Sequence, residues 1–418
     1  MHRFQYRNNH LYVEQIKVSQ IVHKYGTPLY IYSGNAILEQ FQKIQQAFSN
    51  LNPLICYSAK ANSNLSILRL LIKAGAGVDV VSGGELFKAL KAGCRPQKIV
   101  YAGVGKTPQE IEFALRKKIL FINVESYQEL EVIEKLAGKL KLKQKVCLRF
   151  NPDIDAYYTH KYITTGKKET KFGLDEDTIK KIISHRKRFK NVEIKGIHIH
   201  IGSQILELAP FMNAISKAIK LIDNSDIDME YLNIGGGLGI RYKRDEQPLD
   251  IYEYASRIKK LIGRRKIRLI MEPGRFIVGN AGILVTQVIY HKPGINKNFL
   301  IVDAGMHLLL RPALYSAYHE IVPLNKFRKR KYHKFDIVGP ICESSDFLGK
   351  NRKLPEVKPG EYLVVFSTGA YGMCMAFNYN AQPRCREVLV MKNRIYEIRK
   401  PETYYDLISK EKIPQFLK

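Results

Sequence analysis

Short runs rich in valine, isoleucine and aromatic residues alternate with helical segments between about residues 53 and 275. Eight such runs occupy residues 54–58, 77–82, 98–102, 121–124, 146–150, 194–202, 229–234 and 269–272. Two segments between them, 65–75 and 85–93, carry apolar residues at helical spacing and end in glycine. Eight strand–helix repeats predict an α/β fold, a (β/α)8 TIM-type barrel. An open doubly wound sheet remains the alternative, because periodicity counts strands without showing closure.

The pattern changes after about residue 284, where strand-like runs follow one another with few helices between them. Such runs cover residues 283–290, 298–302 and 361–366, and the pair 386–391 and 394–398 predicts a hairpin. We therefore predict a barrel over residues 35–283 and a second, mainly antiparallel β domain made of residues 1–34 and 284–418. The run at 29–32 either joins this β domain or leads into the barrel.

Composition is that of a globular protein with a substantial core. Of the 418 residues 45% are apolar, which excludes disordered and collagen-like classes. No run approaches the ~20 apolar residues of a membrane span, and the first ten residues are followed by no apolar signal region. Six scattered cysteines without a CxxC pair predict reduced thiols and no metal site. We therefore expect a cytoplasmic protein without a membrane partner.

The chain is strongly basic, with 68 Lys and Arg against 39 Asp and Glu, a formal net charge of +29. A nucleic-acid-binding protein shares such a charge. However, the basic residues are spread along the chain among acidic ones, and no zinc-finger spacing or basic heptad region occurs. We expect no nucleic-acid partner and, instead, attraction of small anions.

Two candidate functional groups follow strand ends, where such barrels place their active sites. Lys60 lies among small residues, and desolvation there would lower its pKa and allow the neutral amine to form a Schiff base. A solvated surface lysine is the alternative. The glycine run 235–237 follows the seventh strand and would let backbone N–H groups approach a phosphate, which we expect at a helix N-terminus; a tight turn is the alternative.

Two histidines and a carboxylate complete the set of candidates. His198 and His200 are two residues apart in a strand, so both side chains lie on the same face. His200, at the end of the strand, can stack on a planar ligand. We expect His198 to be a core histidine that is hydrogen-bonded to the backbone. Glu272 after the eighth strand suits a protonated heteroaromatic nitrogen, and Arg275 suits a carboxylate or phosphate. Lysine, phosphate cradle, aromatic face and carboxylate together predict a pyridoxal-phosphate site.

These residues lie in motifs that resemble those of the pyridoxal-phosphate-dependent diaminopimelate decarboxylases, in the alanine-racemase-like barrel group. The resemblance extends from residue 24 to residue 386. Its motifs are 57–62 (YSAKAN), 81–86 (VSGGEL), 198–204 (HIHIGSQ), 235–239 (GGGLG), 272–275 (EPGR), 311–315 (RPALY), 339–346 (GPICESSD) and 369–373 (GAYGM). So many matches in one order would not arise by chance.

The resemblance implies a role for each matched residue. Lys60 would hold pyridoxal 5'-phosphate covalently, His200 would stack on its ring, and Glu272 would pair with the ring nitrogen. The other cofactor contacts implied are Asp79, Ser203, Gly236, Gly237, Pro273, Gly274, Arg275 and Tyr371. Cys342 would be the general acid that protonates the α-carbon, on a loop that reaches into a partner subunit, which implies a homodimer with shared active sites.

The resemblance also implies an amino-acid substrate with a distal carboxylate and ammonium. Its contacts would be Arg275, Arg311, Tyr315, Glu343 and Tyr371. The expected reaction converts meso-2,6-diaminopimelate to L-lysine and carbon dioxide, the last step of lysine biosynthesis. A decarboxylase of ornithine, arginine or carboxynorspermidine is the nearest alternative. A catalytically inactive regulatory homologue is disfavoured by the presence of both Lys60 and Cys342, and a basic RNA-binding protein is the third alternative.

Overall fold

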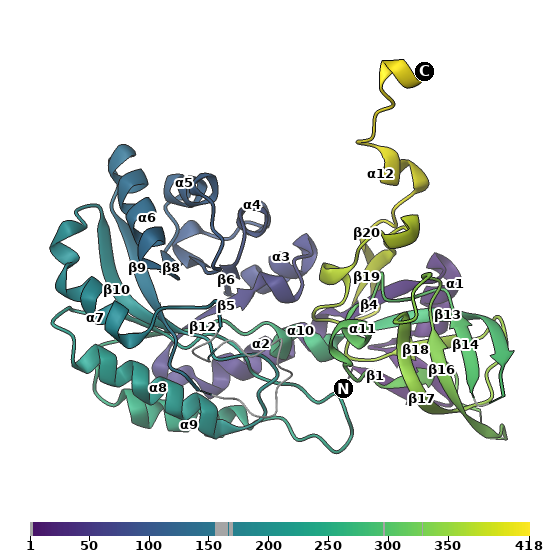
Figure 1. Cartoon of the computed structure of the whole chain (residues 1–418). Helices are drawn as coiled ribbons and strands as arrows, with labels where there is room; N and C mark the ends of the chain where they lie inside the picture. Colours follow the sequence, from purple (N-terminus) through teal and green to yellow (C-terminus); the bar gives the residue numbers. More distant parts are fainter. Residues whose placement is uncertain (1–2, 155–165, 167–169, 296, 328) are drawn as a thin grey trace. The chain divides into compact units, whose positions relative to one another are not determined.

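The computed structural model describes residues 3–154, 166, 170–295, 297–327 and 329–418 (Figure 1). Internal contacts divide the chain into two compact units. The barrel unit comprises residues 37–241 and 245–277, and the β unit comprises residues 1–36, 242–244 and 278–418. The limits of 35–283 for a barrel domain stay a prediction. No helix within the described ranges is long and apolar enough to cross a membrane.

Eight parallel strands of the barrel unit close into a barrel, with the order β10-β11-β12-β5-β6-β7-β8-β9 and β9 paired to β10. The strands are β5 (Leu54–Ser58), β6 (Gly77–Val80), β7 (Ile99–Tyr101), β8 (Phe121–Val124), β9 (Gln144–Phe150), β10 (Val192–Ile199), β11 (Tyr231–Asn233) and β12 (Arg268–Met271). All eight predicted strands are present. The predicted closed barrel is confirmed, and the open sheet is excluded.

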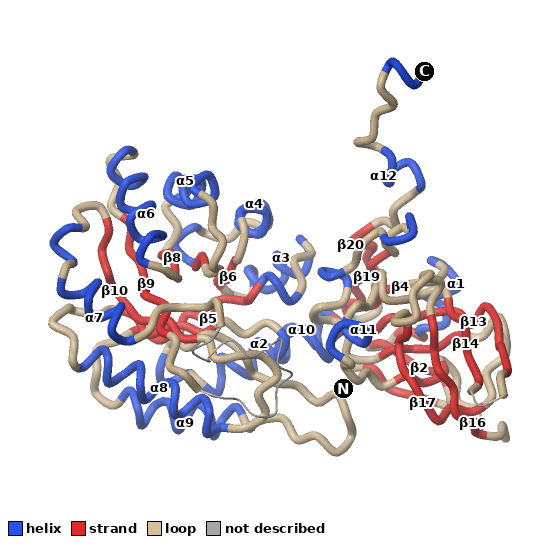
Figure 2. Tube along the Cα trace, in the orientation of Figure 1, coloured by secondary structure: helices blue, strands red, loops and turns tan. Residues whose placement is uncertain are grey.

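Helices alternate with these strands along the chain (Figure 2). They are α2 (Gly34–Ala47), α3 (Leu65–Lys73), α4 (Gly83–Lys91), α5 (Pro108–Lys117), α6 (Tyr127–Lys139), α7 (Glu176–Ser184), α8 (Leu208–Asp223), α9 (Ile251–Ile262) and α10 (Arg275–Val278). The two helices predicted from periodicity are confirmed as α3 and α4. Gly75 and Gly93 follow them with φ of 103° and 84°, a left-handed conformation that ends a helix most easily at glycine.

An apolar layer fills the interior of the barrel. It consists of Leu54, Cys56, Val100, Phe121, Cys147, Tyr231 and Ile270, which form one buried cluster. Every one of these residues is less than a tenth exposed, and Phe121 packs on Tyr231 with 5.5 Å between ring centroids. This layer makes the barrel a packed core, and two residues further along the same strands its polar residues begin.

The β unit contains two sheets. Its strands are β1 (Phe4–Arg7), β2 (His10–Val13), β3 (Ile16–Lys17), β4 (Leu29–Ser33), β13 (Gly282–Pro293), β14 (Asn298–Val302), β15 (Ile321–Pro323), β16 (Tyr332–Val338), β17 (Phe347–Pro355), β18 (Tyr362–Val365), β19 (Arg386–Met391) and β20 (Arg394–Arg399). β1–β3 form a small sheet, and the others form a nine-stranded, mainly antiparallel sheet. Its short helices are α1 (Val18–Tyr25), α11 (Arg311–Tyr315) and α12 (Tyr404–Ile408). The predicted β domain and the hairpin β19–β20 are confirmed.

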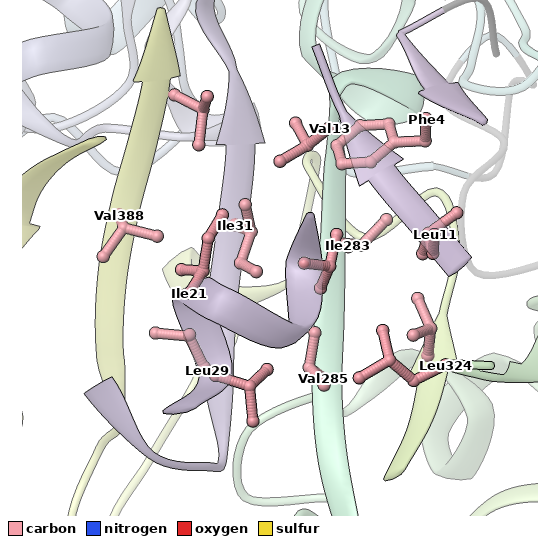
Figure 3. Close-up of a cluster of buried hydrophobic side chains, with 14 of the residues drawn as sticks. Phe4, Leu11, Val13, Ile21, Leu29, Ile31, Ile283, Val285, Leu324 and Val388 are labelled. Atoms are coloured by element: carbon pink, nitrogen blue, oxygen red, sulfur yellow. The ribbon is translucent and has the colours of Figure 1, made fainter. Parts of the chain in front are cut away.

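Strand β4 lies inside the large sheet, between β13 and β19, which resolves the alternative left open for residues 29–32. Ile31 is the cross-strand partner of both Ile283 and Val388, and Leu29 is the partner of Val285. Figure 3 shows these side chains gathered in one buried cluster. Burial of this N-terminal strand therefore ties the two ends of the chain into one core.

Candidate active site

A polar layer lies directly above the apolar layer of the barrel. It consists of Ser58, Asp79, Asn123, Arg149, His198, Asn233 and Glu272, all of them buried. Five of these residues follow a member of the apolar layer by two positions, as Asn123 follows Phe121 and Glu272 follows Ile270. Because strand side chains repeat with period two, both layers lie on the inner face of the barrel.

Glu272 is the centre of this layer. Its Oε1 accepts hydrogen bonds from Asn233 Nδ2 at 2.6 Å and Asn123 Nδ2 at 3.3 Å, and its Oε2 lies 3.2 Å from His198 Nε2. Burial opposes ionisation, but His198, Lys60 and Asn233 together lower the pKa of Glu272 to about 2. The carboxylate is therefore ionised at neutral pH, deep within the barrel.

Asp79 is another buried carboxyl group of this layer, and its pKa is shifted in the opposite direction. Its Oδ2 accepts a hydrogen bond from Ser58 Oγ at 2.6 Å and lies 3.8 Å from Lys60 Nζ. Burial and the nearby Glu272 raise the pKa of Asp79 well above its usual value, against the opposing effect of Lys60. Ionisation is therefore favoured at Glu272 and opposed at Asp79.

Lys60 lies in the turn after β5, within a short 3-10 helix at Ala59–Ala61. Tyr57 fixes this turn by donating its hydroxyl to Asn62 O at 2.9 Å, and the Ser58 N–H donates to Pro273 O at 3.1 Å. The Lys60 side chain is 33% exposed, so its amine remains accessible. The lowered pKa of Lys60 stays a prediction.

His200 follows β10 and lies against the glycine run. The Gly236 N–H donates to His200 Nδ1 at 3.2 Å, so this ring nitrogen is an acceptor. Burial, Lys60 and Arg149 hold the pKa of His200 well below its usual value. A neutral imidazole with a fixed orientation is suited to stack on a planar ring.

The glycine run 235–237 makes contacts that no other residue can make. A Cβ at Gly235 would lie 2.4 Å from Ile199 O, and one at Gly236 would lie 2.2 Å from Glu272 O. Gly235 and Gly237 also have φ of 65° and 95°. The backbone therefore approaches neighbouring strands closely and lines the site without side chains.

One expectation for this run was wrong. No helix begins there, because residues 234–250 contain no helix or strand and α9 starts only at Ile251, capped by Asp250. The loop instead lies close to β10 and β12, where the Gly235 N–H donates to Asn233 Oδ1 at 2.9 Å and the Gly236 N–H donates to His200 Nδ1 at 3.2 Å. A glycine run after a strand predicts close approach of the backbone but does not predict a helix directly after it.

Arg275 and Ser203 meet next to this loop. Arg275 Nη2 donates to Ser203 Oγ at 3.0 Å, and the Arg275 side chain is almost completely buried. Gly274 packs against the Lys60 turn, where an added Cβ would lie 2.9 Å from Ala61 Cβ. A guanidinium, a hydroxyl and side-chain-free backbone together form a cradle suited to a phosphate.

His198 differs from what its sequence position predicted. It is a buried core histidine, as expected, but it faces the Glu272 carboxylate rather than a backbone group. This follows from the strand order, because β10 and β12 both pair with β11 and so bring His198 and Glu272 within reach of each other. His198 therefore belongs to the electrostatics of the site.

Sequence reasoning missed Asn123, Asn233 and Arg149. Each is a polar residue within an otherwise apolar parallel strand, and such strands are normally continuous apolar runs. Arg149 Nη1 pairs with Glu125 Oε1 at 2.5 Å inside the barrel unit. A polar residue two positions after an apolar core residue was the available signal.

The other predicted residues belong to the β unit. Arg311 begins α11 and is 6% exposed, so it is not a surface arginine, and Tyr315 ends this helix. Tyr371 lies in the loop after β18 with φ of 55°, a left-handed conformation that is rare for tyrosine. Arg311 is thus buried, and Tyr371 is held by its surroundings in a conformation that tyrosine rarely adopts.

Cys342 and Glu343 lie exposed in the loop between β16 and β17. The Cys342 N–H donates to Asn380 Oδ1 at 2.8 Å, and Tyr379 Oη donates to Glu343 Oε1 at 3.2 Å. Cys342 is therefore a loop cysteine rather than a buried structural one.

Asp346 organises this loop and was missed as a functional candidate, although its motif was recognised. It accepts hydrogen bonds from the N–H groups of Met306 at 2.6 Å and Ile341 at 2.7 Å. A Cβ at Gly339 would lie 2.5 Å from Asp346 Oδ2. The buried carboxyl group therefore fixes the backbone that leads to Cys342.

Comparisons with known proteins agree on one family. Residues 35–279 match the family model described as the pyridoxal binding domain of pyridoxal-dependent decarboxylases. The diaminopimelate decarboxylase of Aquifex aeolicus is 47% identical over 403 residues, covering 96% of this chain and 95% of that protein.

Two solved structures are also similar over nearly the whole chain. Diaminopimelate decarboxylase from Helicobacter pylori, complexed with L-lysine, has a TM-score of 0.90 and 42% identity, covering 94% of this chain and 99% of that one. The enzyme from M. jannaschii in co-complex with L-lysine has a TM-score of 0.94 and 36% identity, covering 99% of each chain.

Proposed function

The chain belongs to the diaminopimelate decarboxylase family of pyridoxal-dependent carboxy-lyases, and we propose that it converts meso-2,6-diaminopimelate to L-lysine and carbon dioxide, the last step of lysine biosynthesis. The observation that carries the proposal is the polar layer that ends at Lys60, with an ionised Glu272 beneath an accessible amine. The relatives solved with L-lysine support an amino-acid substrate.

The family's cofactor is pyridoxal phosphate, and the residues of the barrel fit it. The side-chain-free glycine run and the Arg275–Ser203 pair suit its phosphate, and the face of neutral His200 suits its ring. When bound, the cofactor supplies an electron-withdrawing ring that accepts the electron pair left when carbon dioxide departs. Lys60 would hold it covalently.

Glu272 acts by keeping a negative charge in place. An ionised carboxylate favours a proton on a facing heteroaromatic nitrogen, and that proton makes the ring more electron-withdrawing. Asn233 and Asn123 orient Glu272, while the raised pKa of Asp79 opposes a second negative charge nearby. The polar layer therefore favours loss of carbon dioxide without taking part in bond breaking.

Cys342 would supply the proton that replaces the lost carboxyl group. The Cα–carboxylate bond breaks, carbon dioxide leaves, and the thiol Sγ–H protonates Cα; the thiolate then regains a proton from water. Since Cys342 lies on an exposed loop of the β unit, we propose that it completes the barrel of a second copy, in a homodimer with shared sites.

Substrate choice would come from charged groups that match the far end of diaminopimelate. Arg311 and Arg275 suit the distal carboxylate, with Tyr315 donating a hydrogen bond, and Glu343 suits the distal ammonium. Tyr371 would contact both substrate and cofactor. A substrate that lacks the distal carboxylate leaves a buried guanidinium without its anion, which costs about 3–5 kcal/mol by analogy with broken buried ion pairs.

The test is turnover of meso-diaminopimelate, compared with ornithine, arginine and carboxynorspermidine, measured as carbon dioxide and amine product. We expect strong preference for diaminopimelate, and preference for ornithine would refute the substrate assignment. Lys60→Ala should abolish turnover and the visible absorption of the bound cofactor. Lys91→Ala, on the exposed end of α4, is the matched control and should change neither.

Mixing two inactive variants tests the shared sites. Lys60→Ala and Cys342→Ala subunits, unfolded together and refolded, should recover about a quarter of wild-type turnover, because half of the random dimers carry one intact site of two. Cys342→Ala alone should lose about 10²–10⁴-fold in turnover while retaining cofactor absorption. No recovery on mixing would place the acid and the lysine in the same subunit.

We also propose a cytoplasmic location, because all six cysteines are free thiols. Fractionation of the source cells tests this, and recovery of the protein outside the cytoplasm would contradict it.

A further inference from the structure

A buried histidine that no role above uses lies behind Arg311. His319 is completely buried between α11 and β15, and its Nε2 is 2.8 Å from Arg311 Nη1. On the other side of the ring, His319 Nδ1 is 2.8 Å from Phe366 O, the first carbonyl after β18. The imidazole thus connects the backbone of the large sheet to the guanidinium.

The two partners determine which ring nitrogen carries the proton. A carbonyl oxygen only accepts, so Nδ1 must donate; a guanidinium only donates, so Nε2 must accept. His319 is therefore neutral, with its proton on Nδ1. A protonated imidazole would turn a second N–H towards Arg311 and bring two positive charges together.

The position of His319 is set by strand pairing. β15 and β18 are antiparallel neighbours, with Ile321 opposite Val365, and the Phe366 N–H donates to Glu320 O at 2.9 Å. His319 and Phe366 therefore lie on adjacent, hydrogen-bonded backbone segments. The ring is attached to a rigid part of the β unit rather than to a loop.

Tyr242 holds the same pair from another direction. Arg311 Cζ lies 4.7 Å from the centroid of the Tyr242 ring, and the Tyr242 and His319 rings meet edge to face at 5.3 Å. One Arg311 nitrogen is bonded to His319 while the flat guanidinium lies against the tyrosine. The rotation of the guanidinium about its long axis is thereby restricted.

We propose that His319 is a positioning residue that orients the Arg311 guanidinium for the distal carboxylate of the substrate, acting as a neutral hydrogen-bond acceptor. The inference rests on the proposed function, since it needs Arg311 to bind substrate. A guanidinium that is already oriented loses less conformational entropy when it forms a bidentate pair of hydrogen bonds with a carboxylate. His319 therefore affects substrate affinity rather than the chemical step.

Three substitutions of His319 separate the acceptor from the rest of the ring. His319→Phe keeps a flat ring and removes both nitrogens, and His319→Asn keeps a donor near Nδ1 but no acceptor at the position of Nε2. His319→Gln keeps an acceptor near Nε2. For the holoenzyme with meso-diaminopimelate we expect the first two to raise KM about 10–100-fold with kcat within about threefold, the weight of one hydrogen bond to a charged group.

His319→Gln should recover most of this loss, and that rescue identifies the acceptor rather than the shape of the ring as the cause. His307→Phe removes another buried histidine of the β unit and is the matched control, with KM expected to be unchanged. Thermal melting of each variant shows whether the protein is folded; His319→Asn and His319→Gln keep the test available where His319→Phe does not fold.

A double-mutant cycle with Arg311→Lys gives the decisive result. If His319 acts through Arg311, the KM of the double variant with His319→Asn equals that of Arg311→Lys alone; independent effects that multiply would overturn the inference. So would an unchanged KM in His319→Asn, or a fall in kcat with KM unchanged. Failure of the wild-type enzyme to decarboxylate diaminopimelate would instead refute the proposed function.

Discussion

The two layers inside the barrel differ in chemistry although they lie on the same strands and the same face. Phe121 and Asn123 are two residues apart on β8, a rise of about 7 Å. Phe121 belongs to the apolar cluster, whereas Asn123 donates to the buried Glu272 carboxylate. Within two residues of the same strand, the interior of the barrel changes from a packed apolar core to a charged site.

The difference teaches how a barrel keeps charges at its centre. The apolar layer requires only close packing and stabilises the fold through burial. The polar layer requires that each buried carboxyl group has a partner: Asn233 and His198 for Glu272, and Ser58 for Asp79. Changes in the lower layer should therefore affect stability, and changes in the upper layer should affect chemistry.

Replacement of Glu272 should have the largest effect on chemistry. Glu272→Gln keeps the shape and removes the negative charge, so we expect turnover to fall about 10²–10⁴-fold while covalent cofactor absorption is retained. Glu131→Gln, exposed on α6, is the control and should be unaffected. Unchanged turnover would show that the charge of the polar layer does not serve the reaction.

Replacement of Phe121 tests the apolar layer. Phe121→Ala removes a completely buried ring and should lower the unfolding free energy by about 3–5 kcal/mol. Turnover per folded molecule should stay within about threefold, because the ring makes no polar contact. Chemical denaturation and active-site titration measure the two quantities, and a large loss of turnover in folded protein would mean that the layers are not separable.

Replacement of Asn233 should have an intermediate effect, since it belongs to both the fold and the site. Asn233→Ala removes the donor to Glu272 and the acceptor of the Gly235 N–H at 2.9 Å. We expect the unfolding free energy, measured by chemical denaturation, to fall by about 1–3 kcal/mol, the usual cost of leaving a buried polar group unpaired. No change in stability would mean that water replaces the amide fully.

Replacement of Asp79 should have the smallest effect, and it should raise the unfolding free energy rather than lower it. Its raised pKa means that the folded protein keeps a proton that the unfolded chain releases above pH 3.8, so stability falls as pH rises. Asp79→Asn removes this term and should increase the unfolding free energy at pH 7 by about 0.5–2 kcal/mol. Glu272 titrates between about 2 and 4.5, so above pH 5 its contribution is constant and the difference between wild type and Asp79→Asn reports Asp79. A variant less stable than wild type at pH 7 would contradict the raised pKa of Asp79.

Local patterns were sufficient to predict the elements of the barrel. Apolar periodicity and a glycine end signal located α3 and α4, and eight apolar runs located the strands. The partner of His198 was not predictable from local patterns, because Glu272 follows β12, a strand far away in sequence that pairs with the other side of β11. The run at residues 29–32 was expected to join the β domain or to lead into the barrel, but its two partners could not be identified, because β13 and β19 lie more than two hundred residues later.

Site residues were predictable where a charged side chain follows the end of a strand within a recognisable motif. They were less predictable where a common polar side chain lies within a strand. Lys60 and Glu272 were identified from strand ends and from family motifs. Asn123 and Asn233 were not, because a single amide in a strand has no motif of its own. Their role is apparent only from their distances to Glu272; Asn233 lies on the strand next to β12, whereas Asn123 reaches Glu272 across the closed barrel.

The central claim is that the polar layer ends at a lysine that holds the cofactor. Borohydride reduction of the holoenzyme makes a lysine–cofactor linkage permanent, and peptide mass mapping then locates it. The account predicts that the added mass lies on the peptide containing Lys60 and on no other. Labelling of a different lysine, or no labelling after incubation with pyridoxal phosphate, would contradict it.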